Sequence, residues 1–174
     1  MKSDNLLELI KANASTITSI EEATVLVEAE PLYLRYIKTD FRTPDVCKKA
    51  VARDGYALRF VPVQMKTPQL CEVAVANSGY ALQYVPVDLR TALLCAMAIE
   101  KVGSALSHVP EKHKTESLCW NAVQVDSWAL DFVPDHLITP ALCRMAVERN
   151  GDVLSLIPNS LKTLELVRIA RWRK

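Results

Sequence analysis

Apolar residues recur along the chain at helical spacing, and the whole pattern then repeats. In residues 43–66 the apolar positions Val46, Cys47, Ala50 and Val51 follow an i, i+1, i+4, i+5 order, which places them on one helical face rather than on a strand. The pattern returns every 24 residues with a threonine at its start, at Thr43, Thr67, Thr91, Thr115, Thr139 and Thr163. The sequence therefore predicts an all-α fold of tandem repeats.

Each repeat carries signals for a helix-turn-helix unit. The threonine hydroxyl can accept a backbone N–H of the first turn, so we expect a helix of about ten residues to begin there. We expect the following glycine to end this helix in the left-handed conformation, because it has no Cβ to resist it. The position is held by Gly55, Gly79, Gly103 and Gly151, with Ser127 in one copy. A short second helix, such as residues 80–85, then runs to a proline.

The repeats predict one elongated domain. A helix pair this short cannot bury its own apolar face, whereas stacked copies can, so we expect an α-solenoid over residues 1–174. Its expected parts are a leader helix at 1–18, a degenerate capping repeat at 19–42, five full repeats at 43–162 and a C-terminal half-repeat at 163–174.

Two copies are close to a known consensus, TPQLCEVAVANSGYALQYVP at 67–86 and TPALCRMAVERNGDVLSLIP at 139–158. They resemble a family of short bacterial helical repeats catalogued as a domain of unknown function. The resemblance covers residues 43–162 well and the flanking copies loosely. The resemblance implies a helical repeat fold and a role in binding another protein. Some bacterial proteins with such repeats look like host-directed effectors, so it implies that role as an option as well. It supplies no activity, cofactor or catalytic residue.

The five cysteines occupy one repeat position, Cys47, Cys71, Cys95, Cys119 and Cys143. Equivalent positions in neighbouring copies should lie ~8–10 Å apart, which is beyond the ~7 Å that a disulfide allows. We therefore interpret them as small buried hydrophobic residues in a reducing compartment. A thiol-dependent enzyme is the alternative, but no cysteine stands out from its equivalents. With no phosphate-binding loop and no metal-ligand spacing, we expect no catalysis, cofactor or metal.

Charge changes the picture little. The net charge of +1 gives no global argument for nucleic acid or a membrane. Basic residues nevertheless precede the capping threonines at Arg42, Lys66, Arg90, Lys114 and Lys162, and Ile138 breaks the series. With the basic C-terminal tail they form a possible nucleic-acid-binding edge; alternatively, they neutralise the carbonyl ends of the second helices. No apolar run reaches the ~18 residues of a membrane span and no signal peptide is evident, so we expect a cytoplasmic protein, with export by an uncleaved route left open.

Positions that vary between copies are the best candidates for function. Trp120 holds an outward position that carries Lys48, Glu72, Ala96 or Arg144 in other copies, and Trp128 begins the second helix of the same repeat. Tryptophan and arginine dominate binding hot spots; alternatively, both tryptophans fill an irregularity created by Ser127. We expect a monomer that binds a protein partner mainly through repeats 91–138. The expected contact residues are Lys101, His108, His113, Trp120, Trp128 and Arg144.

Overall fold

The computed structural model describes residues 17–172, and all secondary structure in this range is helical. The all-α class is therefore confirmed for these residues. Nearly all of the leader helix expected at 1–18, and Arg173 and Lys174 of the basic tail, lie outside the described residues. The chain divides into two compact units, one ending at Leu89 and the other beginning at Arg90.

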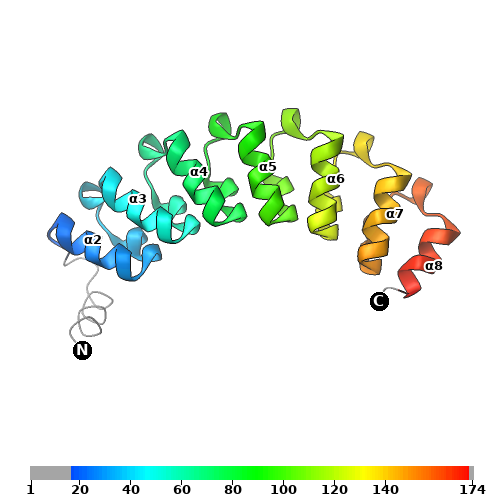
Figure 1. Cartoon of the computed structure of the whole chain (residues 1–174), viewed down its shortest axis with the longest axis horizontal. Coiled ribbons are helices and arrows are strands. Elements are labelled where there is room, and N and C mark those ends of the chain that lie inside the picture. Colours follow the sequence, from blue (N-terminus) through cyan, green and yellow to red (C-terminus); the bar gives the residue numbers. More distant parts are fainter. Residues whose placement is uncertain (1–16, 173–174) are drawn as a thin grey trace. The chain divides into compact units, whose positions relative to one another are not determined.

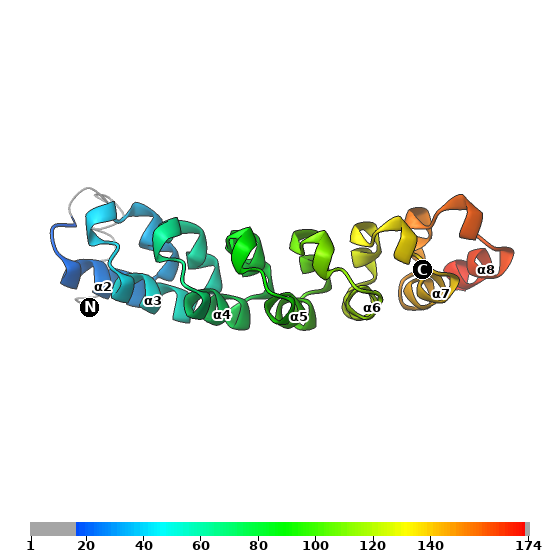
Figure 2. The same ribbon diagram turned by 90° about the horizontal axis from the view of Figure 1, so that it is seen from above.

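In residues 17–89 the first unit contains three helix pairs, each followed by a short turn. Its α-helices are α2 (Ile20–Ala29), α3 (Pro44–Arg53) and α4 (Pro68–Asn77). Each is followed by a six-residue 3₁₀-helix, η2 (Pro31–Tyr36), η4 (Gly55–Phe60) and η6 (Gly79–Tyr84). Three-residue 3₁₀ turns then link the copies, η3 (Thr39–Phe41), η5 (Val63–Met65) and η7 (Val87–Leu89). Within this unit α-helices pack on α-helices and 3₁₀-helices on 3₁₀-helices (Figures 1 and 2).

The second unit follows the same plan. Its α-helices are α5 (Ala92–Lys101), α6 (Glu116–Val125), α7 (Pro140–Arg149) and α8 (Leu164–Trp172). The six-residue 3₁₀-helices are η8 (Gly103–His108), η10 (Ser127–Phe132) and η12 (Gly151–Leu156). The linking turns are η9 (Glu111–His113), η11 (Asp135–Leu137) and η13 (Asn159–Leu161). In this unit too, the α-helices and the 3₁₀-helices form two separate layers (Figure 2).

The threonines begin the α-helices as predicted. Each threonine Oγ1 accepts a hydrogen bond from the backbone N–H three residues later, at 3.2 to 3.4 Å. Pro44, Pro68 and Pro140 occupy the first helical position, where the missing N–H has no helical partner to lose. These local bonds fix where each copy starts.

The second helix of each pair is a 3₁₀-helix because it is short and bounded on both sides. Before η4, Asp54 is extended, with φ −143° and ψ 114°. After it, Pro62 disfavours the α conformation at Val61, which is also extended, with φ −75° and ψ 130°. The six residues between are closed by i→i+3 bonds such as Val61 N–H to the Leu58 carbonyl oxygen, 3.2 Å, a pattern that short segments adopt readily.

The predicted role of the glycines is wrong. No described residue, glycine included, has a positive φ, and each glycine starts a 3₁₀-helix instead of ending an α-helix. The reason for glycine is close packing. A Cβ on Gly55 would lie 2.3 Å from the Ala74 carbonyl oxygen, and one on Gly103 would lie 2.2 Å from that of Ala122. The 3₁₀-helix therefore lies directly against the backbone of the next α-helix.

Adding a methyl group at Gly103 should be costly. We expect Gly103→Ala to lower the free energy of unfolding by about 1–3 kcal/mol, because the Cβ overlaps a carbonyl that belongs to a packed helix. Ser127→Ala is the matched control, because Ser127 already carries a Cβ at the equivalent position, and should change it by about 1 kcal/mol or less. Urea denaturation followed by circular dichroism measures both; equal losses would contradict the packing explanation.

Candidate functional site

The cysteines belong to the core. All five are unpaired and buried, and burial raises the pKa of each thiol, that of Cys47 to about 11. The Cys47 thiol lies 3.7 Å from the Arg42 carbonyl oxygen, to which it can donate. A thiol with a raised pKa is protonated at neutral pH and is a poor nucleophile. Residues 17–172 also contain no group of three or more His, Cys, Asp or Glu side chains that could hold a metal ion.

We name the basic residues that precede the capping threonines the basic ladder, and four of them tie neighbouring copies together. Arg42 donates to the Phe60 carbonyl oxygen at 2.9 Å, and Lys66 to that of Tyr84 at 2.8 Å. In the second unit Arg90 donates to the carbonyl oxygen of His108 at 2.7 Å, and Lys114 to that of Phe132 at 3.1 Å. Each acceptor is the last residue of a 3₁₀-helix, 18 residues further on and therefore in the next copy.

These bonds give the ladder a structural role. All four cations are partly buried, and each lies at the carbonyl end of a 3₁₀-helix, where partial negative charge gathers. These contacts agree with the interpretation that the cations neutralise the carbonyl ends of the second helices, although each cation reaches the helix of the following copy. Ile138 cannot make this bond, so the junction between copies 115–138 and 139–162 lacks it.

The serine at the glycine position falls at the same junction. Ser127 is buried and carries a Cβ where Gly103 has none. The 3₁₀-helix η10 packs less extensively on η12 than on η8. The two departures from the repeat, Ser127 and Ile138, thus coincide with looser packing of α7 and η12 on the copy before them.

The histidines expected at the contact surface have a mainly structural environment. His108 and His113 are partly buried. Burial and the neighbouring Arg90 lower the pKa of His108, so its ring is neutral at neutral pH, while its main-chain oxygen accepts the Arg90 bond. Lys101 is exposed at the end of α5. Neither of the cavities lined by η12 and α8 or by η2, η4 and η6 includes these three residues or the tryptophans.

The two tryptophans lie on different layers. Trp120 is on α6 and 36% exposed, and Trp128 is on η10 and 47% exposed, so neither ring lies in the core. Arg144 holds the place of Trp120 one helix further on, in α7, and is ion-paired with Glu148 at 2.7 Å and Glu165 at 3.2 Å. Trp120 and Arg144 therefore share the α layer, whereas Trp128 belongs to the 3₁₀ layer.

The first unit presents a group of rings that the sequence-based prediction missed. We name Tyr56, Arg59, Phe60, Tyr80 and Tyr84 the aromatic cluster. The ring centroid of Tyr56 lies 6.4 Å from that of Tyr80 and 6.2 Å from that of Tyr84. The Arg59 guanidinium lies over the rings of Phe60 and Tyr84, at 5.7 and 6.0 Å from their centroids. These side chains are ordered by one another on the outer side of η4 and η6.

The signal for this cluster was present in the sequence. Tyr56 and Tyr80 hold the second position of consecutive 3₁₀-helices, and Phe60 and Tyr84 hold the sixth. A search for positions that vary between copies passes over them, because consecutive copies carry an aromatic ring at the same position. Their proximity depends on how one copy stacks on the next, which a single repeat does not reveal.

A shallow cavity of about 170 Å³ lies beside the cluster, lined by Leu32, Arg35, Tyr56, Arg59, Phe60 and Tyr84. The Arg35 guanidinium lies 4.2 Å from the ring centroid of Tyr36. Among residues 17–172, neither Arg35 nor Arg59 pairs with a carboxylate. Partial burial and the nearby phenols raise the pKa of Tyr56, so its hydroxyl remains a donor. The surface combines apolar ring faces with two cations that pair with no carboxylate of residues 17–172.

The buried thiols predict a pH-dependent stability. The unfolded pKa of cysteine is about 8.5 and that of folded Cys47 is about 11, so folding favours the protonated thiol. Its contribution is complete at neutral pH and is lost as pH rises from about 8.5 towards 11. Urea denaturation between pH 7 and 10.5 should show this decline, and Cys47→Ala should make it shallower.

The same burial should protect the cysteines from alkylation. At pH 8 we expect all five to react with iodoacetamide far more slowly in the native protein than in guanidinium chloride, as counted by mass spectrometry. One cysteine that reacts rapidly while the others stay protected would contradict this expectation and would support the hypothesis of a thiol-dependent enzyme.

The bond from Lys114 should contribute measurably to stability. Lys114→Met leaves the Phe132 carbonyl oxygen without its charged donor, and we expect a loss of about 1–3 kcal/mol in the free energy of unfolding. Lys112→Met removes an exposed lysine from the same turn and should cost about 0.5 kcal/mol or less. Thermal denaturation of the two variants side by side measures the difference; a similar loss in both would show that the bond has no special weight.

A family model matches part of the chain. Residues 43–90 match the family model described as a domain of unknown function, DUF4116. No curated protein and no solved structure matches the chain. Within residues 17–172, none of the helices has both the length and the apolar character needed to cross a membrane. The matched stretch contains the whole aromatic cluster, and it is similar to a domain family for which no function is established.

Proposed function

We propose that this protein is a non-catalytic scaffold that binds another protein, and that the aromatic cluster is its main contact surface. The observation that carries the proposal is the mutual packing of exposed rings in the first unit. Tyr56 and Tyr80 are 36% and 39% exposed, yet each ring is in contact with a neighbour. Rings and arginines held in place before binding lose little conformational freedom in a complex, and they dominate binding hot spots.

An α-solenoid of 24-residue repeats is the architecture that we propose to present this surface. In every full copy the cysteine and the alanine three residues after it are fully buried, which supports stacking through a constant layer. The constant layer then sets the spacing of the copies, while exposed positions vary and set specificity.

The chemistry of the surface favours a partner segment that carries both apolar and acidic side chains. The ring faces of the cluster offer apolar contact, and Arg35 and Arg59 offer charge to a carboxylate. Trp128 holds in the second unit the position that Tyr56 and Tyr80 hold in the first, so it offers the same kind of ring contact there. Trp120, with Arg144, is proposed as a separate contact on the α layer, while His108, His113 and Lys101 have supporting roles.

Two other functions have less support. Thiol catalysis needs an ionised cysteine, whereas burial raises the pKa of all five thiols. Nucleic-acid binding along the basic ladder needs available cations, whereas four of them donate to carbonyl oxygens. A protein partner remains the function that the exposed side chains favour.

Site-specific crosslinking tests the proposal. A photoreactive phenylalanine analogue placed at Tyr80 should capture a specific partner in the cells that make the protein. The same analogue at Gln64, an exposed residue of η5, is the matched control and should capture none. With the partner purified, Tyr56→Ala and Arg59→Ala should each weaken binding about tenfold or more, with unchanged circular dichroism. Equal affinity in wild type and both variants would show that the partner does not use the cluster.

Trp120 requires a separate measurement. If it is a contact residue, Trp120→Ala weakens binding of the same partner without lowering the melting temperature. If the melting temperature falls by several degrees while binding survives, the ring serves folding and the assignment is wrong.

A further inference from the structure

The shallow cavity beside the aromatic cluster is positively charged. Arg35 and Arg59 both line it, together with Leu32 and three rings, and among the described residues no carboxylate lines it. Its volume of about 170 Å³ is below the ~300–1,000 Å³ of pockets for drug-sized ligands, so it fits a single side chain of a partner. Its walls favour a side chain that is both flat and anionic.

Both guanidinium groups are held in place by rings. Arg59 lies over the rings of Phe60 and Tyr84, and Arg35 lies over the ring of Tyr36, whose hydroxyl accepts one of its N–H groups. A guanidinium group carries five N–H donors in one plane, so a ring against its face leaves open the edge that binds an anion. Within residues 17–172 the side chain of Arg59 donates no hydrogen bond, so its donors can turn to a ligand.

Two further cations lie behind the cavity. Arg42 donates to the main-chain oxygens of Arg35 and Phe60, at 3.1 and 2.9 Å. Lys66 donates to that of Tyr84 at 2.8 Å. These oxygens belong to the carbonyl ends of the 3₁₀-helices that carry the lining side chains, where partial negative charge gathers. Because that charge is already neutralised, it does not weaken the attraction of the cavity for an anion.

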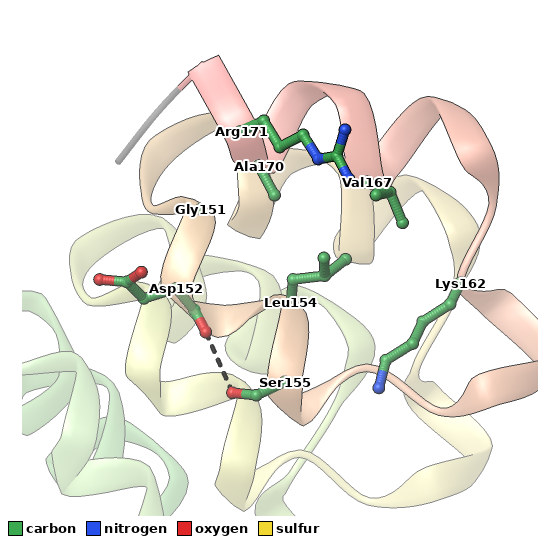
Figure 3. A pocket seen from close by; sticks show the side chains of 8 residues that line it. All are labelled: Gly151, Asp152, Leu154, Ser155, Lys162, Val167, Ala170 and Arg171. Atoms are coloured by element: carbon green, nitrogen blue, oxygen red, sulfur yellow. Dashed lines mark hydrogen bonds between the residues drawn. The ribbon is translucent and has the colours of Figure 1, made fainter.

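Carboxylates distinguish this cavity from the larger one in the second unit. The cavity of about 420 Å³ that η12 and α8 line includes Asp152 as well as two cations (Figure 3), so part of its positive charge is balanced. At the aromatic cluster, Asp54 accepts the Tyr56 N–H at 2.8 Å. It lies before the start of η4, whereas Arg59 is near the end of that helix. The guanidinium end of the cluster therefore keeps its excess positive charge.

We propose that this cavity binds a phosphotyrosine side chain of the protein partner, an inference that rests on the proposed function. The phosphate group carries about −1.5 to −2 charge at neutral pH and three acceptor oxygens, which matches two guanidinium groups, whereas a carboxylate carries one charge. The phenyl ring of the same side chain packs against the rings of Tyr56, Phe60 and Tyr84. Phosphoserine supplies the anion without a ring. Phosphorylation of the partner then switches its binding on.

A titration with labelled peptides tests this specificity. The probe is a fluorescent pentapeptide, acetyl-Ala-Ala-Tyr-Leu-Ala, prepared in three forms with tyrosine, phosphotyrosine or phosphoserine at its centre. Binding to the full-length protein is followed by fluorescence anisotropy. We expect saturable binding of the phosphotyrosine form and at least about tenfold weaker binding of the other two, because each lacks either the charged hydrogen bonds or the ring.

Variants of the cavity locate the binding. Arg59→Gln and Arg35→Gln should each weaken binding of the phosphotyrosine peptide about tenfold or more, because each removes one of the two charged donors. Lys48→Gln removes the same charge from an exposed position on α3, in the other layer of the same unit, and should bind as wild type does. Both arginines are exposed, so all three variants should keep the circular dichroism spectrum of the wild type.

Three results would overturn the proposal. They are the absence of saturable binding up to about 1 mM phosphotyrosine peptide, equal affinity for either of the other two peptides, and equal affinity in Arg59→Gln and wild type. Crosslinking at Tyr80 is a separate readout. A partner that is captured there, and that binds equally well after phosphatase treatment, preserves the proposed function and removes the phosphotyrosine assignment. Absence of a crosslinked partner counts against the proposed function, while the titration still decides what the cavity binds.

Discussion

Both units depend on the approach of each 3₁₀-helix to the backbone of the next α-helix. Where glycine starts the 3₁₀-helix, no side chain separates it from an alanine carbonyl of the following copy. From the other side, a cation of the earlier copy reaches the last carbonyl of the following 3₁₀-helix. One contact is steric and the other is electrostatic, and together they fix the distance and the register between copies.

The sequence predicted what is local and failed where neighbouring copies meet. Threonine caps and buried cysteines follow from the order of residues within one copy, and the structure confirms them. The glycine conformation was wrong because a glycine before a short helix has two explanations, backbone freedom or close approach, and only packing distinguishes them. The sequence does not predict the linking turns η3, η5, η7, η9, η11 and η13, because three residues are too few to show periodicity.

The candidate surfaces show the same limit. Trp120 and Trp128 stand out when copies are compared, and their exposure agrees with an outward position. Their separation onto two layers depends on where α6 ends and η10 begins. The aromatic cluster escaped notice because its tyrosines match one another, so a search for variable positions passes over them. Two adjacent copies with the same ring form a surface that neither forms alone.

The junction between copies 115–138 and 139–162 has a consequence for folding. In a repeat array, stability is approximately a sum of terms for each copy and each interface, and cooperativity is transmitted through the interfaces. Ser127 and Ile138 remove the steric fit and the charged bond from one interface at once. The chain from Thr139 onwards is therefore the segment of the second unit whose folding is least coupled to the rest. Two side chains would then set the boundary of a cooperative folding unit, without a linker or any break in the repeat.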